Sequence, residues 1–229
     1  MTGLSCSMAI IGDGSVGKST IIQAFRSNGF VSSSVYKQTV GCDFYEKQLR
    51  LRGDIYVSLR VWDIGGQSIS SKNLESYLTH SNVIMLIYDV TNKESFENLS
   101  DWLVRVKNFS SSPYIYLLGN KVDLISTRQV TKMQHDLFVA QHGLRGSLFT
   151  SAKTGENVVK MFYKVTGEAV GVQLTEYELG FYDQVLTAHI AKSTNLDEVR
   201  NPYADEIEQE DLRAMQKRDK RSQMKCALS

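Results

Sequence analysis

A phosphate-binding signature near the amino terminus is the strongest constraint on the fold of this chain. Residues 12–19 read GDGSVGKS, which fits the pattern G-x-x-x-x-G-K-S, and the apolar run MAII comes directly before them. Glycines let the backbone curl so that its N–H groups point toward phosphate oxygens, and a following helix adds partial positive charge. The pattern predicts a phosphate-binding loop between a buried strand and a helix. A glycine-rich turn with an incidental lysine is the alternative interpretation.

The polar residues of this loop have separate expected roles. The Lys18 side chain is placed to reach the outer phosphates of a nucleotide, and the Ser19 hydroxyl is placed to bind Mg²⁺. The residues expected to surround the phosphates are Gly14, Ser15, Val16, Gly17, Lys18, Ser19 and Thr20. The loop alone indicates a nucleotide, but it identifies neither the base nor the reaction.

Apolar runs alternate with amphipathic stretches along most of the chain. Strands are expected at residues 7–11, 44–51, 55–64, 83–90, 114–119 and 147–151, and helices at 17–27, 68–79, 93–109, 130–142 and 155–171. Two of the runs are continuously apolar, as in parallel strands buried on both faces, whereas the second and third alternate around RGD like an antiparallel hairpin. We therefore predict an α/β fold: a six-stranded, mostly parallel sheet with one antiparallel edge strand and helices on both faces.

Length and composition favour one domain followed by a tail. The chain has 229 residues and a formal net charge of +1, which argues against nucleic-acid binding through bulk electrostatics. Its three cysteines lack the spacing of a zinc site or disulfide framework, which fits a reducing compartment, and we expect neither secretion nor a membrane span. A domain is expected over residues 1–172 and a mobile tail over 173–229, in which a short amphipathic helix near residues 180–193 is an open alternative.

Two short motifs predict which base is bound. The segment GNKVD at residues 119–123 follows the fifth expected strand. The Asp123 carboxylate can accept two hydrogen bonds from the N1–H and N2–H₂ groups of guanine, a donor pair that adenine lacks. Asn120 can bond another edge of the base, and the stem of Lys121 can pack over its face.

The segment TSAKTG at residues 150–155 follows the sixth expected strand. It would add Ser151, an Ala152 N–H group for guanine O6, and Lys153 over the ring. Either motif alone is more typical of an ordinary surface loop than of a base-binding site. Because both come in order after a phosphate-binding loop, they predict guanine together.

The segment VWDIGGQ at residues 61–67 and a threonine before it predict how the γ-phosphate is bound. Asp63 would hold Mg²⁺, the Gly66 N–H would meet the γ-phosphate, and Gln67 would orient the attacking water as the catalytic residue. Thr39 would bind Mg²⁺ only when a γ-phosphate is present. The alternatives are a strand-end turn in which Asp63 caps the next helix, and a Thr39 that is merely part of the polar surface.

With these motifs in order, residues 8–172 resemble the Ras superfamily of small GTPases. The segments VGCDF, WDIGGQ and YDVTNKESFENL resemble the Rab family, and YKQTVGCDF and DWLVRVK are most similar to its divergent, CaaX-ending subgroup numbered twenty-eight. The resemblance implies a monomeric GTP/GDP switch in vesicle traffic that uses Mg²⁺ and hydrolyses GTP slowly unless assisted. It also implies protein effectors, an exchange factor and an activating protein, and a place on the cytosolic face of endosomal or ciliary membranes.

The resemblance also implies roles for four aromatic residues. Phe44, Trp62 and Tyr77 match the trio at the effector surface of the family, a position that is equally compatible with ordinary packing. Phe30 is the candidate for stacking on guanine, although VSSSV at residues 31–35 makes the loop after it longer than usual.

The segment around Gln67 departs from the usual Rab pattern W-D-T-A-G-Q-E. Ile64, Gly65 and Ser68 replace the Thr, Ala and Glu of that pattern. A glycine beside Gly66 loosens the backbone and would slow intrinsic hydrolysis. A GTP-bound scaffold with negligible hydrolysis therefore remains an alternative. An adenylate-type kinase does not fit, because Asp123 disfavours adenine and no arginine-rich lid is apparent.

The last four residues, CALS, predict a lipid anchor at Cys226. They fit the C-a-a-X pattern, and the terminal serine favours a farnesyl group. One lipid chain binds membranes marginally, so a second signal is expected from basic residues. Those residues are Arg213, Lys217, Arg218, Lys220, Arg221 and Lys225. Acidic residues 205–211 and Asp219 oppose this, and a solvated charged helix is the alternative. We expect reversible membrane attachment.

Overall fold

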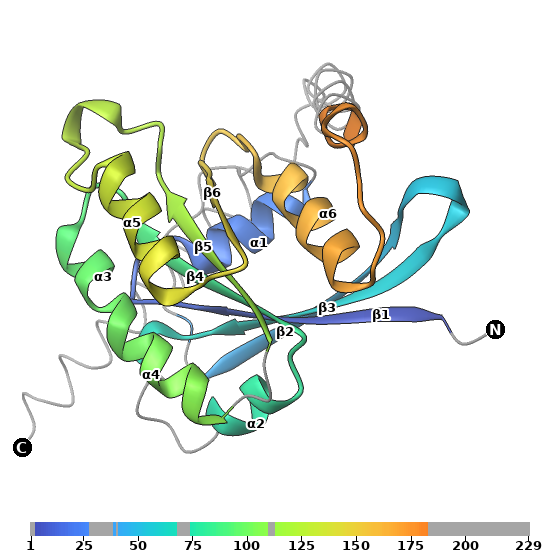
Figure 1. Cartoon of the computed structure of the whole chain (residues 1–229), viewed down its shortest axis with the longest axis horizontal. Helices are drawn as coiled ribbons and strands as arrows, with labels where there is room; N and C mark the ends of the chain where they lie inside the picture. The colour runs from blue at the N-terminus through green and yellow to red at the C-terminus, as the bar shows by residue number, and fades with distance from the viewer. Residues whose placement is uncertain (1–2, 28–38, 40, 68–73, 110–112, 183–229) are drawn as a thin grey trace, which may run out of the picture. The chain divides into compact units, whose positions relative to one another are not determined.

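One six-stranded sheet forms the centre of the molecule (Figure 1). The computed structural model describes residues 3–27, 39, 41–67, 74–109 and 113–182. The strands lie in the order β2-β3-β1-β4-β5-β6, and β2 is antiparallel to β3 whereas all other neighbours are parallel. Their bounds are Leu4–Ile11 (β1), Cys42–Arg50 (β2), Tyr56–Ile64 (β3), Val83–Asp89 (β4), Tyr114–Asn120 (β5) and Gly146–Phe149 (β6). The expected sheet, with its antiparallel edge strand, is confirmed.

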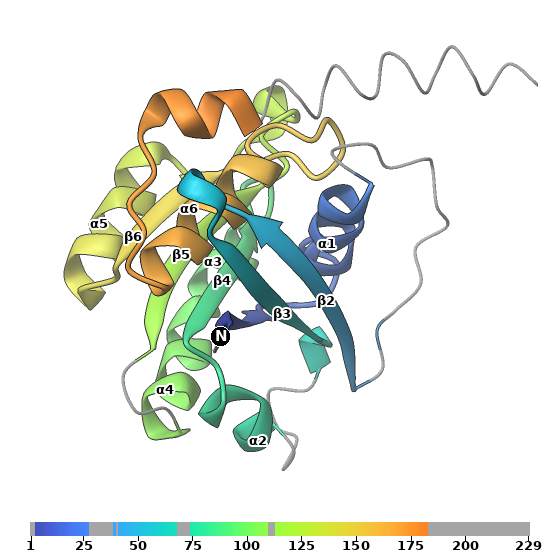
Figure 2. The same cartoon turned by 90° about the vertical axis from the view of Figure 1, so that its right-hand side faces the viewer.

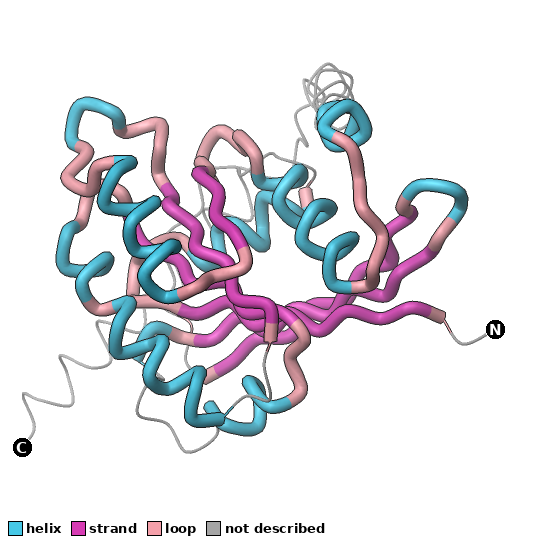
Figure 3. The backbone as a smooth tube through the Cα atoms, viewed as in Figure 1, coloured by secondary structure: helices cyan, strands magenta, loops and turns pink. Residues whose placement is uncertain are grey.

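Helices connect the parallel strands and cover both faces of the sheet (Figure 3). Their bounds are Lys18–Arg26 (α1), Leu74–Thr79 (α2), Lys93–Glu97 (α3), Leu99–Phe109 (α4), Lys132–His142 (α5) and Val158–Ala169 (α6). The single helix expected over residues 93–109 is two helices that meet at Asn98. The first is capped by Asn92, whose side chain accepts a hydrogen bond from the backbone N–H of Ser95.

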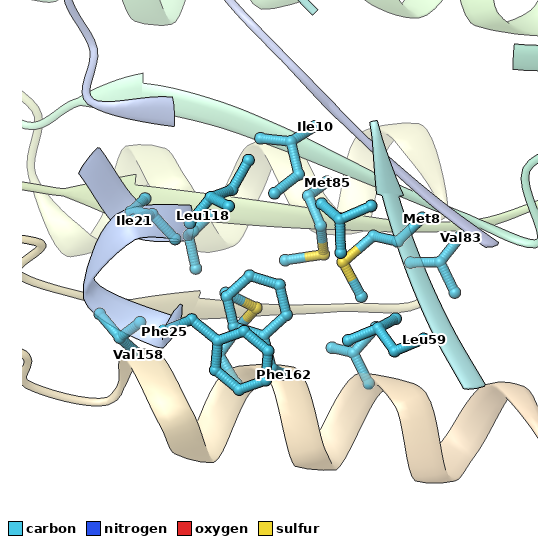
Figure 4. Close-up of a cluster of buried hydrophobic side chains, with 14 of the residues drawn as sticks. Met8, Ile10, Ile21, Phe25, Leu59, Val83, Met85, Leu118, Val158 and Phe162 are labelled. Atoms are coloured by element: carbon cyan, nitrogen blue, oxygen red, sulfur yellow. The ribbon is translucent and has the colours of Figure 1, made fainter. Parts of the chain in front are cut away.

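Helices α1 and α6 pack on one face of the sheet (Figure 4). The rings of Phe25 and Phe162 stack with their centroids 3.9 Å apart. They lie beside Met8 and Ile10, which are both fully buried. Residues at alternate positions of a strand point to the same face, so this spacing turns these two side chains toward α1 and α6.

Helices α2, α4 and α5 pack on the opposite face. Ala9 and Ile11, the other alternating set of β1, lie there with Leu78 of α2 and Trp102 of α4. Burial on both faces explains why β4 is continuously apolar in sequence, since all of its residues are buried.

The carboxyl-terminal boundary of the domain differs from the expected one. Residues 176–182 form a helix. Leu179 is buried, and the ring of Tyr182 stacks on Tyr163 of α6 with centroids 4.0 Å apart. Glu178 pairs with Arg52 of the β2–β3 turn at 3.7 Å. Packed structure therefore continues to residue 182, beyond the boundary at residue 172 that the sequence predicts, because Leu179 and Tyr182 are three residues apart and share one helix face.

The remaining part of the expected tail, residues 183–229, lies outside the described residues. No described helix is both long enough and apolar enough to cross a membrane.

Candidate functional site

The phosphate-binding loop lies between β1 and α1, as the sequence predicts. Gly12 and Gly17 have φ angles of 139° and 98°, in the region that favours glycine. A Cβ atom on Gly12 would lie 2.1 Å from the Ile87 carbonyl oxygen, and one on Gly17 would lie 2.3 Å from Asn120 Nδ2. Both glycines are therefore required by close packing as well as by the curl of the backbone.

The Lys18 ammonium group lies inside this loop. Its Nζ atom donates hydrogen bonds to the carbonyl oxygens of Gly12 at 2.8 Å and Asp13 at 2.6 Å. Burial lowers the pKa of Lys18 to about 8, although the negative charges of Asp63 and Asp13 oppose that shift. The loop thus holds a poorly solvated cation, which is an environment that favours a bound phosphate.

Three oxygen-bearing side chains predicted to bind Mg²⁺ come together beside the loop. The Ser19 hydroxyl donates a hydrogen bond to Asp63 Oδ2 at 2.5 Å, and its oxygen lies 2.9 Å from Thr39 Oγ1. Burial raises the pKa of Asp63, which means that its charged form lacks solvation. Among the described residues, Asp63 Oδ1 is buried without a hydrogen-bond partner.

These residues fit a magnesium ion better than a transition metal. Hydroxyl and carboxylate oxygens are hard ligands, and Mg²⁺ is usually bound by few protein groups together with substrate phosphates. The described residues contain no cluster of three or more His, Cys, Asp or Glu side chains that would hold a metal ion. The unpartnered Asp63 oxygen is consistent with a cation at this position.

Gly66 lies directly against the phosphate-binding loop. A Cβ atom on it would be 2.2 Å from the Gly14 nitrogen and 2.5 Å from the Asp13 carbonyl carbon. The neighbouring Gly65 donates its backbone N–H to the Gly41 carbonyl oxygen at 2.9 Å. Gln67 is exposed. The backbone of the 61–67 segment therefore lies against the loop that is expected to bind the outer phosphates, and Gln67 is the next residue of that segment.

Asn120 joins the phosphate-binding loop to the loop after β6. It is fully buried, and its Nδ2 atom donates to the Val16 carbonyl oxygen at 2.8 Å. Its Oδ1 atom accepts from the Ala152 backbone N–H at 3.0 Å and from Thr150 Oγ1 at 3.4 Å. The sequence assigned Asn120 to the base, and it gave no indication of this structural role because the partners are far apart in the chain.

The side chain expected to recognise guanine is held in place by a neighbour. Ser151 donates its hydroxyl to Asp123 Oδ1 at 2.7 Å, so the two motifs are in direct contact. Lys121 has a φ of 68°, and its ammonium lies 2.7 Å from Asp89 Oδ2. Asp89, which the sequence analysis missed, ends β4 next to Asn120 at the end of β5.

The three aromatic residues of the candidate effector surface form a continuous row. The ring centroids of Phe44 and Trp62 are 4.7 Å apart, and those of Trp62 and Tyr77 are 5.5 Å apart. They come from β2, β3 and α2, and Phe44 is 51% exposed. The row is therefore assembled by the fold and is open to a partner at the Phe44 end.

The remaining candidates are placed less centrally or lie outside the description. Thr20 is half-buried on α1, and Lys153 is exposed. Phe30, Ser68, Cys226 and the basic residues of the tail lie outside the described residues.

Comparisons with known proteins find a family model and curated relatives that match this chain. Residues 7–170 match the model of the Ras family. The chain is 39% identical over 176 residues to the Ras-related protein Rab-28 of Caenorhabditis elegans, an alignment that covers 75% of this chain and 70% of that protein. It is 41% identical over 160 residues to the Ras-related protein Rab-4 of Dictyostelium discoideum, which covers 69% of this chain and 75% of that protein. The residues matched to the family include every loop of the site.

Proposed function

Because the chain belongs to the Ras family and, within it, to the Rab proteins, we propose that it is a Mg²⁺-dependent switch with slow intrinsic GTP hydrolysis. As a Rab-family small GTPase it alternates between GTP and GDP in membrane traffic. The convergence of Ser19, Thr39 and Asp63 is the observation that carries the finer proposal. Thr39 precedes β2, and Asp63 is the second-last residue of β3, so a group that binds both links two separate segments of the chain.

Mg²⁺ would be held by Ser19, Thr39 and Asp63, and when bound it would neutralise negative charge on the outer phosphates. Lys18 would bind these phosphates with its buried ammonium. The Gly66 N–H would donate to the γ-phosphate, and Gln67 would orient the attacking water. Loss of the γ-phosphate would remove the interaction of Gly66 and release its segment.

Guanine specificity is proposed to come from Asp123. The hydrogen bond from Ser151 uses one carboxylate oxygen at 2.7 Å and fixes the orientation of the group. Such a carboxylate can accept both donors of guanine, while adenine would leave it unpaired. The test is competition against bound fluorescent GDP: GTP should displace it, and displacement by ATP at similar concentrations would refute this specificity.

Slow hydrolysis is expected because the two segments that would surround the γ-phosphate carry no arginine in their sequences. The sequence contains none at residues 27–41 or 64–73. An activating protein would have to supply one, with a rate gain of about 10³–10⁵. Single-turnover hydrolysis should therefore be slow in the pure protein and slower still in Gln67→Leu. Fast hydrolysis would contradict the proposal, and equal rates in both proteins would favour a GTP-bound scaffold.

Dependence on Mg²⁺ has a separate test. Chelation by EDTA should accelerate the release of fluorescent GDP from the wild-type protein. Asp63→Asn should release it faster than wild type in the presence of Mg²⁺, and the response to EDTA should be smaller. Identical release with and without EDTA would show that the metal is not part of the site.

We also propose reversible attachment to the cytosolic face of a membrane through a prenylated Cys226, supported by the C-a-a-X pattern of the last four residues. Cys226→Ser should move the protein from the membrane fraction of cells to the soluble fraction. Unchanged partitioning would refute the lipid anchor without affecting the proposed nucleotide cycle.

A further inference from the structure

A hydrogen-bonded bridge joins the phosphate-binding loop to the start of helix α4. The Asp13 carboxylate accepts one bond from Asn98 Nδ2 at 2.7 Å and another from Trp102 Nε1 at 2.9 Å. Each of its two oxygens serves one donor, and the donors come from residues 85 and 89 positions later in the chain. The carboxylate of Asp13 is thus directed toward α4.

The location of the two donors explains why they meet one carboxylate. They are four residues apart and therefore lie on the same side of the helix. Trp102 is fully buried, and a buried indole N–H requires an acceptor. Asn98 lies at the junction of α3 and α4, where its backbone carbonyl accepts the N–H groups of Asp101 and Trp102. The junction residue Asn98 and the first turn of α4 therefore direct both donors toward the phosphate-binding loop.

The main chain of Asp13 faces the phosphate-binding side. Its carbonyl oxygen accepts a hydrogen bond from Lys18 Nζ at 2.6 Å. A Cβ atom on Gly66 would meet the backbone of Gly14 and the carbonyl carbon of Asp13, so Gly66 lies against this part of the loop. One residue is therefore fixed by α4 through its side chain, while its peptide group contacts both the phosphate-binding lysine and the segment that would bind the γ-phosphate.

We propose that Asn98 and Trp102 are positioning residues for nucleotide retention. By holding the Asp13 carboxylate, they keep the neighbouring carbonyl aligned with Lys18 and keep a negative charge turned away from the phosphates. Without them the carboxylate is free to rotate toward the Lys18 ammonium and compete with phosphate for it. The inference rests on the proposed binding of GDP and GTP, and it adds two residues outside the recognised nucleotide loops.

The first test removes the donors one at a time. Trp102→Phe deletes the indole N–H while keeping an aromatic ring, and Asn98→Ala deletes the amide. Each should release fluorescent GDP about tenfold faster than wild type, because each removes a hydrogen bond to a charged acceptor.

The matched control is Tyr116→Phe. It also deletes one polar hydrogen from a buried aromatic residue, namely the hydroxyl that donates to Glu168 at 2.7 Å on another part of the sheet. Release from this control should match wild type even if its thermal stability falls as much as that of Trp102→Phe. Equal release rates in Trp102→Phe, Asn98→Ala and the control would overturn the inference.

The second test exchanges the donor and the acceptor. Asp13→Asn should accelerate release, because one of its amide hydrogens then opposes the Asn98 amide. Adding Asn98→Asp to this variant restores matched donors and acceptors. The amide of residue 13 then donates a hydrogen bond to the carboxylate of residue 98, and its oxygen accepts one from Trp102. The double variant should return to within about threefold of the wild-type release rate, as expected for directly coupled sites.

A double variant that releases GDP as fast as Asp13→Asn would overturn the bridge and assign the effect to the charge of Asp13 alone. Failure of the wild-type protein to bind GDP would overturn the proposed function instead, so the two failures are distinguishable.

Discussion

Asn120 Oδ1 accepts the backbone N–H of Ala152 at 3.0 Å, which connects the loop after β5 to the loop after β6. The same side chain donates to the Val16 carbonyl oxygen in the phosphate-binding loop. One buried amide therefore holds together the segments expected to bind the base and the phosphates.

Asn120→Ala should weaken GDP binding by about 100-fold, because it leaves backbone groups of Val16 and Ala152 buried without their partner. Thr150→Val is the matched control, since it removes only the longer hydrogen bond to Asn120, at 3.4 Å. It should weaken GDP binding by less than about fivefold. Titration of fluorescent GDP measures both. Similar losses in the two variants would show that Asn120 does not act through these loops.

Gly66→Ala should disturb the γ-phosphate side of the site alone. The new Cβ would clash with the backbone of Gly14 and Asp13, so the segment has to move away. A displacement of this size is expected to slow single-turnover hydrolysis by about tenfold or more, with GDP affinity nearly unchanged. Gly180→Ala is the control, because its Cβ would meet nothing within 4 Å. Unchanged hydrolysis in Gly66→Ala would argue against this contact.

His135 should make the protein less stable in mild acid. It is fully buried on α5, with Nδ1 2.9 Å from the Tyr88 hydroxyl. Burial lowers the pKa of His135 from 6.5 to about 4; nearby Asp136 opposes the shift, while Arg128 and Lys132 add to it. The unfolded chain therefore binds the proton first, and stability falls as the pH drops from about 6.5 toward 4, by about 3 kcal/mol in total.

Urea unfolding at several pH values measures this effect. His135→Gln should flatten the dependence between pH 6.5 and 4 relative to wild type. His142→Gln, which changes another histidine of the same helix, should keep the wild-type slope. An unchanged slope in His135→Gln would assign the acid sensitivity to other groups.

The helix at residues 176–182 should contribute to the stability of the domain. Leu179 is 1% exposed and Tyr177 is 86% exposed, so the same short helix supplies a buried and an exposed position. Leu179→Ala should lower the free energy of unfolding by about 2 kcal/mol, whereas Tyr177→Ala should change it by about 0.5 kcal/mol or less. Equal effects in chemical denaturation would mean that this helix is not packed on the domain in solution.

The parts of the fold that follow local patterns were predictable from the sequence. Continuous apolar residues at 83–90 indicated β4, and the alternation around RGD indicated the antiparallel pair β2 and β3. The phosphate-binding loop was predictable because its spacing and the flanking strand and helix are all local. The expected meeting of Ser19, Thr39 and Asp63 followed from the roles assigned to their motifs at one magnesium ion, not from a local pattern.

The contacts that the sequence did not reveal join residues far apart in the chain. Nothing local to Asp13 indicates that Asn98 and Trp102 bind its carboxylate, and nothing local to Asn120 indicates its bond to Val16. The helix at residues 176–182 was missed for another reason. Two turns of helix provide too few apolar positions for a periodic pattern. The helix packs on α6 through Tyr182 and Tyr163, a contact between residues that are 19 positions apart in the chain.

The ion pair of Arg52 and Glu178 places the helix at residues 176–182 beside the β2–β3 turn (Figure 2). That turn lies beyond the amino ends of β1 and β3, because Leu4 pairs with Val57, whereas the phosphate-binding loop follows the carboxyl end of β1. The eight residues of β1 separate the two ends by about 25 Å. The described chain therefore ends, at residue 182, at the end of the sheet opposite the phosphate-binding loop. A lipid anchor in the segment that follows, as proposed above, would leave the domain on the side away from the proposed nucleotide site.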